Sequence, residues 1–129
     1  MLWGDRMKIV RRDDPDLSED RRRFTGENVS LVRKVNEQRL GGMRVAVVRF
    51  PRGTRTVWHF HHGEQLLYVL SGRGWFEAGT GKHEISAGDI VYVAPGEKHW
   101  HGATAVSDLE HLAITVGETE WEEEVADPG

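Results

Sequence analysis

Two histidine-rich blocks contain the residues of this chain that are best suited to chemistry. One reads HFHHGEQ from position 59, and the other reads PGEKHWH from position 95. If the first block is a strand, His59 and His61 face the same side, because side chains alternate with a period of two. These two imidazoles, the oxygen of Gln65 and the distant imidazole of His99 form a mixed nitrogen and oxygen set. Sets of this kind bind Mn, Fe, Ni or Zn, so the sequence predicts a metal site.

The oxygen ligand of this site has two candidates that are neighbours in the chain. Gln65 shares one strand face with Leu67 and Val69, whereas Glu64 falls on the preceding turn. Parity therefore favours Gln65 as the fourth ligand. In the alternative, Glu64 or a water molecule completes the metal sphere, and Gln65 only forms a hydrogen bond near it.

The other histidines separate into surface and interior positions. His62 alternates away from the predicted ligands and His83 lies near a turn, so both are expected at the surface. His101 shares the parity of His99, and it either lines the cavity or makes structural hydrogen bonds. His111 lies between apolar neighbours, either as a core histidine with satisfied hydrogen bonds or as a proton-transfer group. The ordinary pKa of histidine, about 6.5, allows proton exchange at neutral pH.

The composition is that of one compact domain and excludes several classes of function. At 129 residues the chain has room for one core. Its formal net charge of -4 does not suit a nucleic-acid footprint, which needs a basic stripe. No apolar run approaches the roughly 18 residues of a membrane span, and the amino terminus has no apolar signal region. The absence of cysteine excludes disulfides and thiolate chemistry. We expect a cytoplasmic protein that acts on a small molecule, without nucleic-acid or membrane partners.

Short β-rich runs separated by glycine turns predict an all-β sandwich or small barrel. Residues 72–74 (GRG) and 79–81 (GTG) are interpreted as hairpin turns, because no helix follows either one. The runs that we interpret as strands are 29–35, 43–50, 54–61, 65–70, 74–78, 82–85, 90–93 and 109–116.

The two ends of the chain differ from this pattern. Residues 1–28 are polar and irregular and are expected to form an arm, whereas residues 29–117 are expected to form the barrel. Residues 118–129 are an acidic tail in which Trp121 and Val125 lie at helical spacing. This spacing predicts a short helix docked on the barrel.

The two blocks and the glycines around them resemble the two sequence motifs of the cupins. This resemblance implies a double-stranded β-helix (jelly-roll) barrel, a homodimer, and a divalent metal held by His59, His61, Gln65 and His99. The common cupin ligand at the third position is a glutamate five residues after the second histidine, whereas Gln65 lies four residues after it. The proline usual in the second motif is displaced to Pro95, and Ala94 takes its expected place. The matching positions are Gly53, His59, His61 and Gly72 in the first motif and Gly88, Asp89, Gly96, Glu97, Lys98 and His99 in the second.

A longer run, residues 99–104 (HWHGAT) followed by 111–114 (HLAI), is similar to a group of small bacterial cupins. That group is related to carboxymuconolactone decarboxylase and includes hydroxynitrile lyases. The resemblance implies a manganese site of three histidines and one glutamine, and it makes His111 a barrel-facing candidate for catalysis.

Because none of the four implied ligands is charged, the metal would keep its full double charge and act as a strong Lewis acid. We therefore expect lyase, decarboxylase or isomerase chemistry on a small oxygenated substrate. The alternatives are an Fe(II) dioxygenase and a module that binds a metal or small ligand without catalysis.

Overall fold

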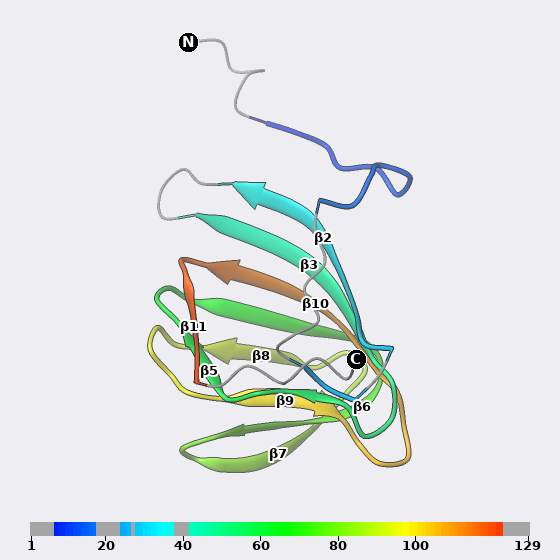
Figure 1. The fold of residues 1–129 in the computed structure, drawn as a ribbon, viewed down its shortest axis with the longest axis vertical. Coiled ribbons are helices and arrows are strands. Elements are labelled where there is room, and N and C mark those ends of the chain that lie inside the picture. The colour runs from blue at the N-terminus through cyan, green and yellow to red at the C-terminus, as the bar shows by residue number, and fades with distance from the viewer. Residues whose placement is uncertain (1–6, 18–23, 27, 38–41, 123–129) are drawn as a thin grey trace.

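The computed structural model describes residues 7–17, 24–26, 28–37 and 42–122. These residues form only strands, turns and irregular segments, so they contain no helix that could cross a membrane. Two curved sheets face each other and make a half-barrel (Figure 1). This confirms the predicted all-β double-sheet fold. The strands are β1 (Phe24–Thr25), β2 (Ser30–Glu37), β3 (Met43–Phe50), β4 (Arg55–Thr56), β5 (His59–His61), β6 (Gln65–Ala78), β7 (Gly81–Ser86), β8 (Ile90–Val93), β9 (Trp100–Ala103), β10 (Leu109–Val116) and β11 (Thr119–Trp121).

The larger sheet has the antiparallel order β2-β3-β10-β6-β8. Every second residue of β10, from Leu109 to Thr115, is buried, and the residues between them are half-buried. Such alternation is expected of a strand that turns one face to the core. Leu109, Phe50 of β3 and Leu67 of β6 are fully buried members of the hydrophobic core. The inward residues of these strands therefore form one wall of the barrel interior.

Strand β6 joins the two sheets. Its first part, residues 65–72, lies in the larger sheet, and its second part, residues 73–78, pairs with β7 and β9. The strand changes sheets at Gly72, where φ is +79° and an added Cβ would lie 1.8 Å from the carbonyl oxygen of Asp108. Only glycine accepts this conformation at so close an approach. The predicted hairpin turn at residues 72–74 is therefore wrong, because the chain bends there without reversing.

The turn predicted at residues 79–81 is confirmed as the connection between β6 and β7. The other departures from the predicted elements concern short strands. The run 54–61 is split into β4 and β5, and β1 and β9 were not expected. Thr119–Trp121 forms β11, which pairs with β5, so the predicted carboxyl-terminal helix is wrong for these residues. The remainder of that predicted helix, from residue 123, lies outside the described residues.

Candidate metal centre

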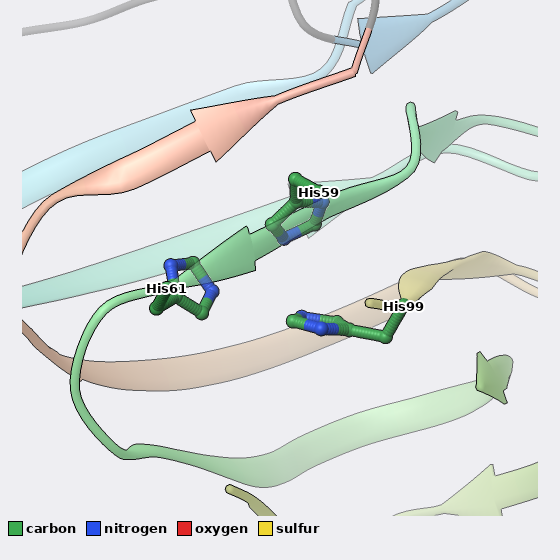
Figure 2. Close-up of side chains that lie close together, drawn as sticks. All are labelled: His59, His61 and His99. Atoms are coloured by element: carbon green, nitrogen blue, oxygen red, sulfur yellow. The ribbon is translucent and has the colours of Figure 1, made fainter. Parts of the chain in front are cut away.

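Strand β5 and the segment before β9 bring three imidazoles together. His59 and His61 lie on one face of β5, as alternation requires. His99 is held opposite His59 by two backbone hydrogen bonds of 2.9 Å, one in each direction. One ring nitrogen from each histidine lies within 4.8 Å of the others, and all three residues are buried. Figure 2 shows the three side chains gathered around a common space.

Each of the three rings is anchored through its Nδ1 atom. His59 and His99 each place Nδ1 2.8 Å from the backbone carbonyl oxygen of the residue two positions earlier. A carbonyl only accepts, so both Nδ1 atoms carry the proton and both Nε2 atoms keep a lone pair. His61 Nδ1 lies 2.7 Å from the hydroxyl oxygen of Thr119 on β11. Hydrogen bonds of this kind orient histidines for metal binding.

Gln65, at the start of β6, adds an amide oxygen to the same interior. Its Nε2 donates a hydrogen bond of 2.8 Å to Thr115 Oγ1, so Oε1 is the free end of the amide. Gln65 Oε1, His61 Nε2 and His99 Nε2 are all buried without a hydrogen-bond partner in the described part of the chain. Buried polar atoms without partners are costly. A divalent cation that accepts nitrogen and oxygen ligands fits this donor set.

The competing oxygen ligand, Glu64, has a different environment. Glu64 is exposed and accepts a hydrogen bond of 2.5 Å from the hydroxyl of Tyr92, which is 55% exposed. Gln65 is 4% exposed and lies close enough to His61 to affect the pKa of that ring. These surroundings favour Gln65 over Glu64.

Burial keeps the clustered histidines neutral. Desolvation lowers the pKa of His61 to about 3, helped by His99, whereas the Gln65 side chain raises it. Desolvation is also the main cause that lowers the pKa of His99, and it holds the pKa of His59 well below the ordinary value. Neutral imidazole is the form that binds a metal, so the site is ready for a cation at neutral pH.

A second pair of buried histidines lies beside this cluster. His111 is 0% exposed, His101 is 5% exposed, and His111 Nε2 lies 3.0 Å from His101 Nδ1. The His101 and His59 rings meet edge-on with centroids 5.5 Å apart. Desolvation lowers the pKa of His111 to about 4 and that of His101 well below its ordinary value. His101 thus both lines the cavity and makes a structural hydrogen bond. His111 does not keep the ordinary pKa that the sequence suggested.

The site opens into a cavity of about 380 Å³. Sequence reasoning did not identify three side chains that line it: Arg44, Thr119 and Trp121. Arg44 Nη2 donates a hydrogen bond of 3.0 Å to Thr119 Oγ1. Desolvation lowers the pKa of Arg44, and Glu118 raises it. The Trp121 ring lies against His59, with centroids 4.4 Å apart. Strand alternation in β3 would have placed Arg44 on the inward face, whereas no local pattern marked the residues of β11.

The two histidines predicted at the surface are found there. His62 is exposed, with Nε2 3.1 Å from Glu120 Oε1. His83 is exposed, with Nε2 3.2 Å from the hydroxyl oxygen of Thr80. Neither residue belongs to the metal site.

A double-sheet half-barrel that encloses a three-histidine cluster is the arrangement of a metal-binding cupin. Residues 46–115 match the family model of the cupin domain, so the chain belongs to the cupin family. Among solved structures, a cupin-like protein from Thermotoga maritima has a TM-score of 0.76 and 32% sequence identity, over 89% of this chain and 91% of that chain. A polyketide cyclase from Streptomyces resistomycificus has a TM-score of 0.70 at 20% identity, over 95% of this chain and 89% of that chain. The second likeness concerns the fold alone.

Two curated relatives have names that state an activity or a ligand. The chain is 49% identical over 70 residues to an (R)-mandelonitrile lyase from Granulicella tundricola, which is 54% of this chain and 53% of the relative. It is 35% identical over 72 residues to an oxalate-binding protein from Thermotoga maritima, which is 55% of this chain and 60% of the relative. The chain therefore spans little more than half the length of these two relatives.

Proposed function

We propose that this chain binds one divalent transition metal, manganese first of all, through its three clustered histidines and Gln65. We propose further that it acts as a metal-dependent lyase on a small oxygenated substrate. One observation carries the proposal: all three Nδ1 atoms are anchored, while His61 Nε2, His99 Nε2 and Gln65 Oε1 are buried without hydrogen-bond partners among the described residues. This leaves a nitrogen and oxygen set that suits Mn, with Fe, Ni and Zn as alternatives.

A bound cation would supply Lewis acidity, which polarises a substrate oxygen. The side chains contribute by leaving that charge undiminished, because the imidazoles and the Gln65 amide are all neutral. A glutamate in place of Gln65 would offset one unit of positive charge. The Trp121 ring lies against His59 and gives that side of the site an apolar surface. Ala46 and Ala113, which also line the cavity, leave room for a small molecule.

His101 and His111 are the residues that we propose to hold and move a proton. Both rings line the cavity, and His111 Nε2 lies 3.0 Å from His101 Nδ1, so a proton taken up by one ring can pass to the other. Their lowered pKa values leave the pair neutral at pH 7. A neutral ring can accept a proton from a bound ligand and return it, which is the role of a general base and acid.

One named relative supports a lyase, whereas the other, an oxalate-binding protein, supports the binding module. An (R)-mandelonitrile lyase shares 49% of its residues with this chain over the matched 70 positions. The alternatives that we retain are an Fe(II) dioxygenase and a non-catalytic binding module. A lyase cleaves its substrate without oxygen, a dioxygenase consumes oxygen, and a binding module does neither, so one set of assays can separate them.

The decisive assay is release of benzaldehyde from (R)-mandelonitrile under anaerobic conditions by manganese-loaded protein. His111→Ala should keep the metal and lose turnover by about 100-fold or more. His62→Ala, the matched exposed histidine, should change neither quantity. Oxygen uptake by iron-loaded protein without anaerobic cleavage would identify a dioxygenase instead. Metal binding with neither activity would identify a binding module, and wild-type protein that takes up no metal would contradict the site itself.

We also propose that two copies pair through the outer face of the larger sheet. This face carries outward apolar and aromatic side chains from the neighbouring strands β8, β6, β10 and β3. Contiguous exposed apolar faces are uncommon on monomers. A second copy is the proposed occupant because a two-fold axis through such a face covers it on both chains at once. Tyr68 is 42% exposed near the centre of this face, so Tyr68→Lys should separate the pair. Sedimentation velocity at micromolar concentration measures this, and a wild-type protein that is only monomeric would contradict it. Register places the outward side chains in two rows, Tyr92, Leu66, Ile114 and Val45 in one and Ile90, Tyr68, Leu112 and Val47 in the next.

A further inference from the structure

The cavity has a polar row of side chains on the wall formed by the larger sheet. Register places Gln65, Thr115 and Arg44 side by side on β6, β10 and β3, and all three line the cavity. In the next row, Ala113 and Ala46 are paired, and their small side chains leave open space. Arg44 is thus the charged end of the row that begins with the proposed oxygen ligand.

The guanidinium of Arg44 is also close to the histidine cluster. Its Nη2 donates to Thr119 Oγ1 at 3.0 Å, and the same oxygen lies 2.7 Å from His61 Nδ1. A single hydroxyl therefore separates the guanidinium from a ring of the proposed metal site. This bond uses one of the five N–H groups of the guanidinium, whose planar fork suits a carboxylate.

Among the described residues that line the cavity, Arg44 is positive and Glu118, the carboxylate that acts on it, is negative. The proposed metal site has no charged ligand, so a divalent cation would add two further positive charges. An anionic ligand would offset this excess, whereas a neutral ligand would leave it.

We propose that Arg44 anchors the carboxylate of the substrate, and that the substrates are small 2-hydroxy or 2-oxo carboxylates. The carboxylate would lie against Arg44, with the neighbouring oxygen toward Gln65 and the histidines. The contact of the neighbouring oxygen rests on the proposed metal site, whereas the contact of the carboxylate rests on Arg44 alone. Two oxygen groups on adjacent carbons suit this arrangement, because the hydroxyl of Thr119 contacts both the guanidinium and the His61 ring. A neutral cyanohydrin would offer the guanidinium no charged group to bind.

The test compares two ligands of the same shape and different charge, (R)-mandelate and (R)-mandelamide, by isothermal titration calorimetry. Manganese-loaded wild-type protein should bind mandelate more tightly. Arg44→Ala should weaken mandelate by about 10-fold or more, the scale of a charge-assisted hydrogen bond, and change mandelamide by less than about 3-fold. Arg44→Lys should fall between, because an ammonium keeps the charge without the planar fork. Arg49→Ala removes an exposed arginine of the same strand that pairs with Asp108, so it should change neither ligand.

A second variant, which should strengthen mandelate binding, keeps the test valid even if Arg44→Ala does not fold. Glu118→Gln removes the carboxylate that acts on Arg44, so it should tighten mandelate and leave mandelamide unchanged. Repeating the titrations on metal-free protein, with metal content measured on every sample, separates the two proposals. If the protein takes up no metal or does not cleave the cyanohydrin, the lyase proposal fails. The preference for mandelate over mandelamide can still be measured on metal-free protein. The carboxylate site is overturned if wild-type protein prefers mandelamide or does not bind mandelate. It is also overturned if Arg44→Ala weakens both ligands equally, or if Glu118→Gln weakens mandelate.

Discussion

Acidification should destabilise the metal-free protein, and His111 allows one part of that loss to be measured. Burial lowers the pKa of His111 to about 4 in the folded protein, whereas an unfolded histidine titrates at about 6.5. Between these two pH values the His111 imidazole binds a proton in the unfolded chain but not in the folded chain. The stability contributed by neutral His111 is therefore complete above about pH 6.5 and is lost as the pH falls toward about 4.

The size of this effect follows from the two pKa values. Lowering the pKa from about 6.5 to about 4 corresponds to about 3.4 kcal/mol over the whole window. About 1.8 kcal/mol of this falls between pH 7 and pH 5, where proteins are readily studied. Folded domains are stable by only about 5 to 15 kcal/mol, so a loss of this size is measurable.

Urea unfolding of EDTA-treated protein at pH 7 and pH 5 is the assay. The loss of unfolding free energy between the two pH values should be smaller in His111→Gln than in wild type by about 1.8 kcal/mol. The comparison across pH removes any constant cost of placing an amide in the core. His83→Gln is the matched control, because that imidazole is exposed and should leave the loss unchanged. An identical loss in His111→Gln and wild type would refute the assignment of His111 as a buried neutral group.

Other predictions concern the metal and the fold. Purified protein should carry about one transition metal per chain, and a double variant with His59→Ala and His99→Ala should lose it, as elemental analysis of both would show. Gln65→Glu should keep the metal yet slow anaerobic mandelonitrile cleavage, because a carboxylate offsets part of the cation's charge; faster cleavage would contradict this. Gly72→Ala should lower the free energy of unfolding by about 3 kcal/mol or more, because its Cβ would meet a carbonyl oxygen at 1.8 Å. Gly79→Ala, with nothing within 4 Å of the added Cβ, is the control in the same urea experiment.

The sequence was most informative where the relevant information is local. His59 and His61 share a face because they lie two apart in one strand, and this follows from alternation alone. The contribution of His99 depends on pairing between segments far apart in the chain, which no local pattern determines, and the resemblance to known motifs strengthened its assignment. The structure brings these three rings together, while the assignment of Gln65 as a ligand and of His111 in catalysis stays a prediction.

Residues whose roles depend on non-local pairing were missed. Thr119 and Trp121 belong to an acidic stretch whose spacing favours a helix, but backbone pairing with β5 makes it a strand. Such tertiary pairing commonly overrides local propensity. Gly72 was assigned to a hairpin turn because no helix follows residues 72–74. Its role as a bend between sheets depends on the backbone of Asp108, which local sequence does not reveal.

The hydroxyl of Thr119 has a consequence for the order in which the site matures during synthesis. All three clustered histidines precede Thr119 in the chain, and β11 pairs with β5 only after residues 119–121 have been made. A nascent chain therefore has its three imidazoles before the group that orients the His61 ring. Metal captured at that stage would meet a ring still free to offer either nitrogen. Selective uptake of the cation is thus expected to follow the docking of β11, late in the folding of the protein.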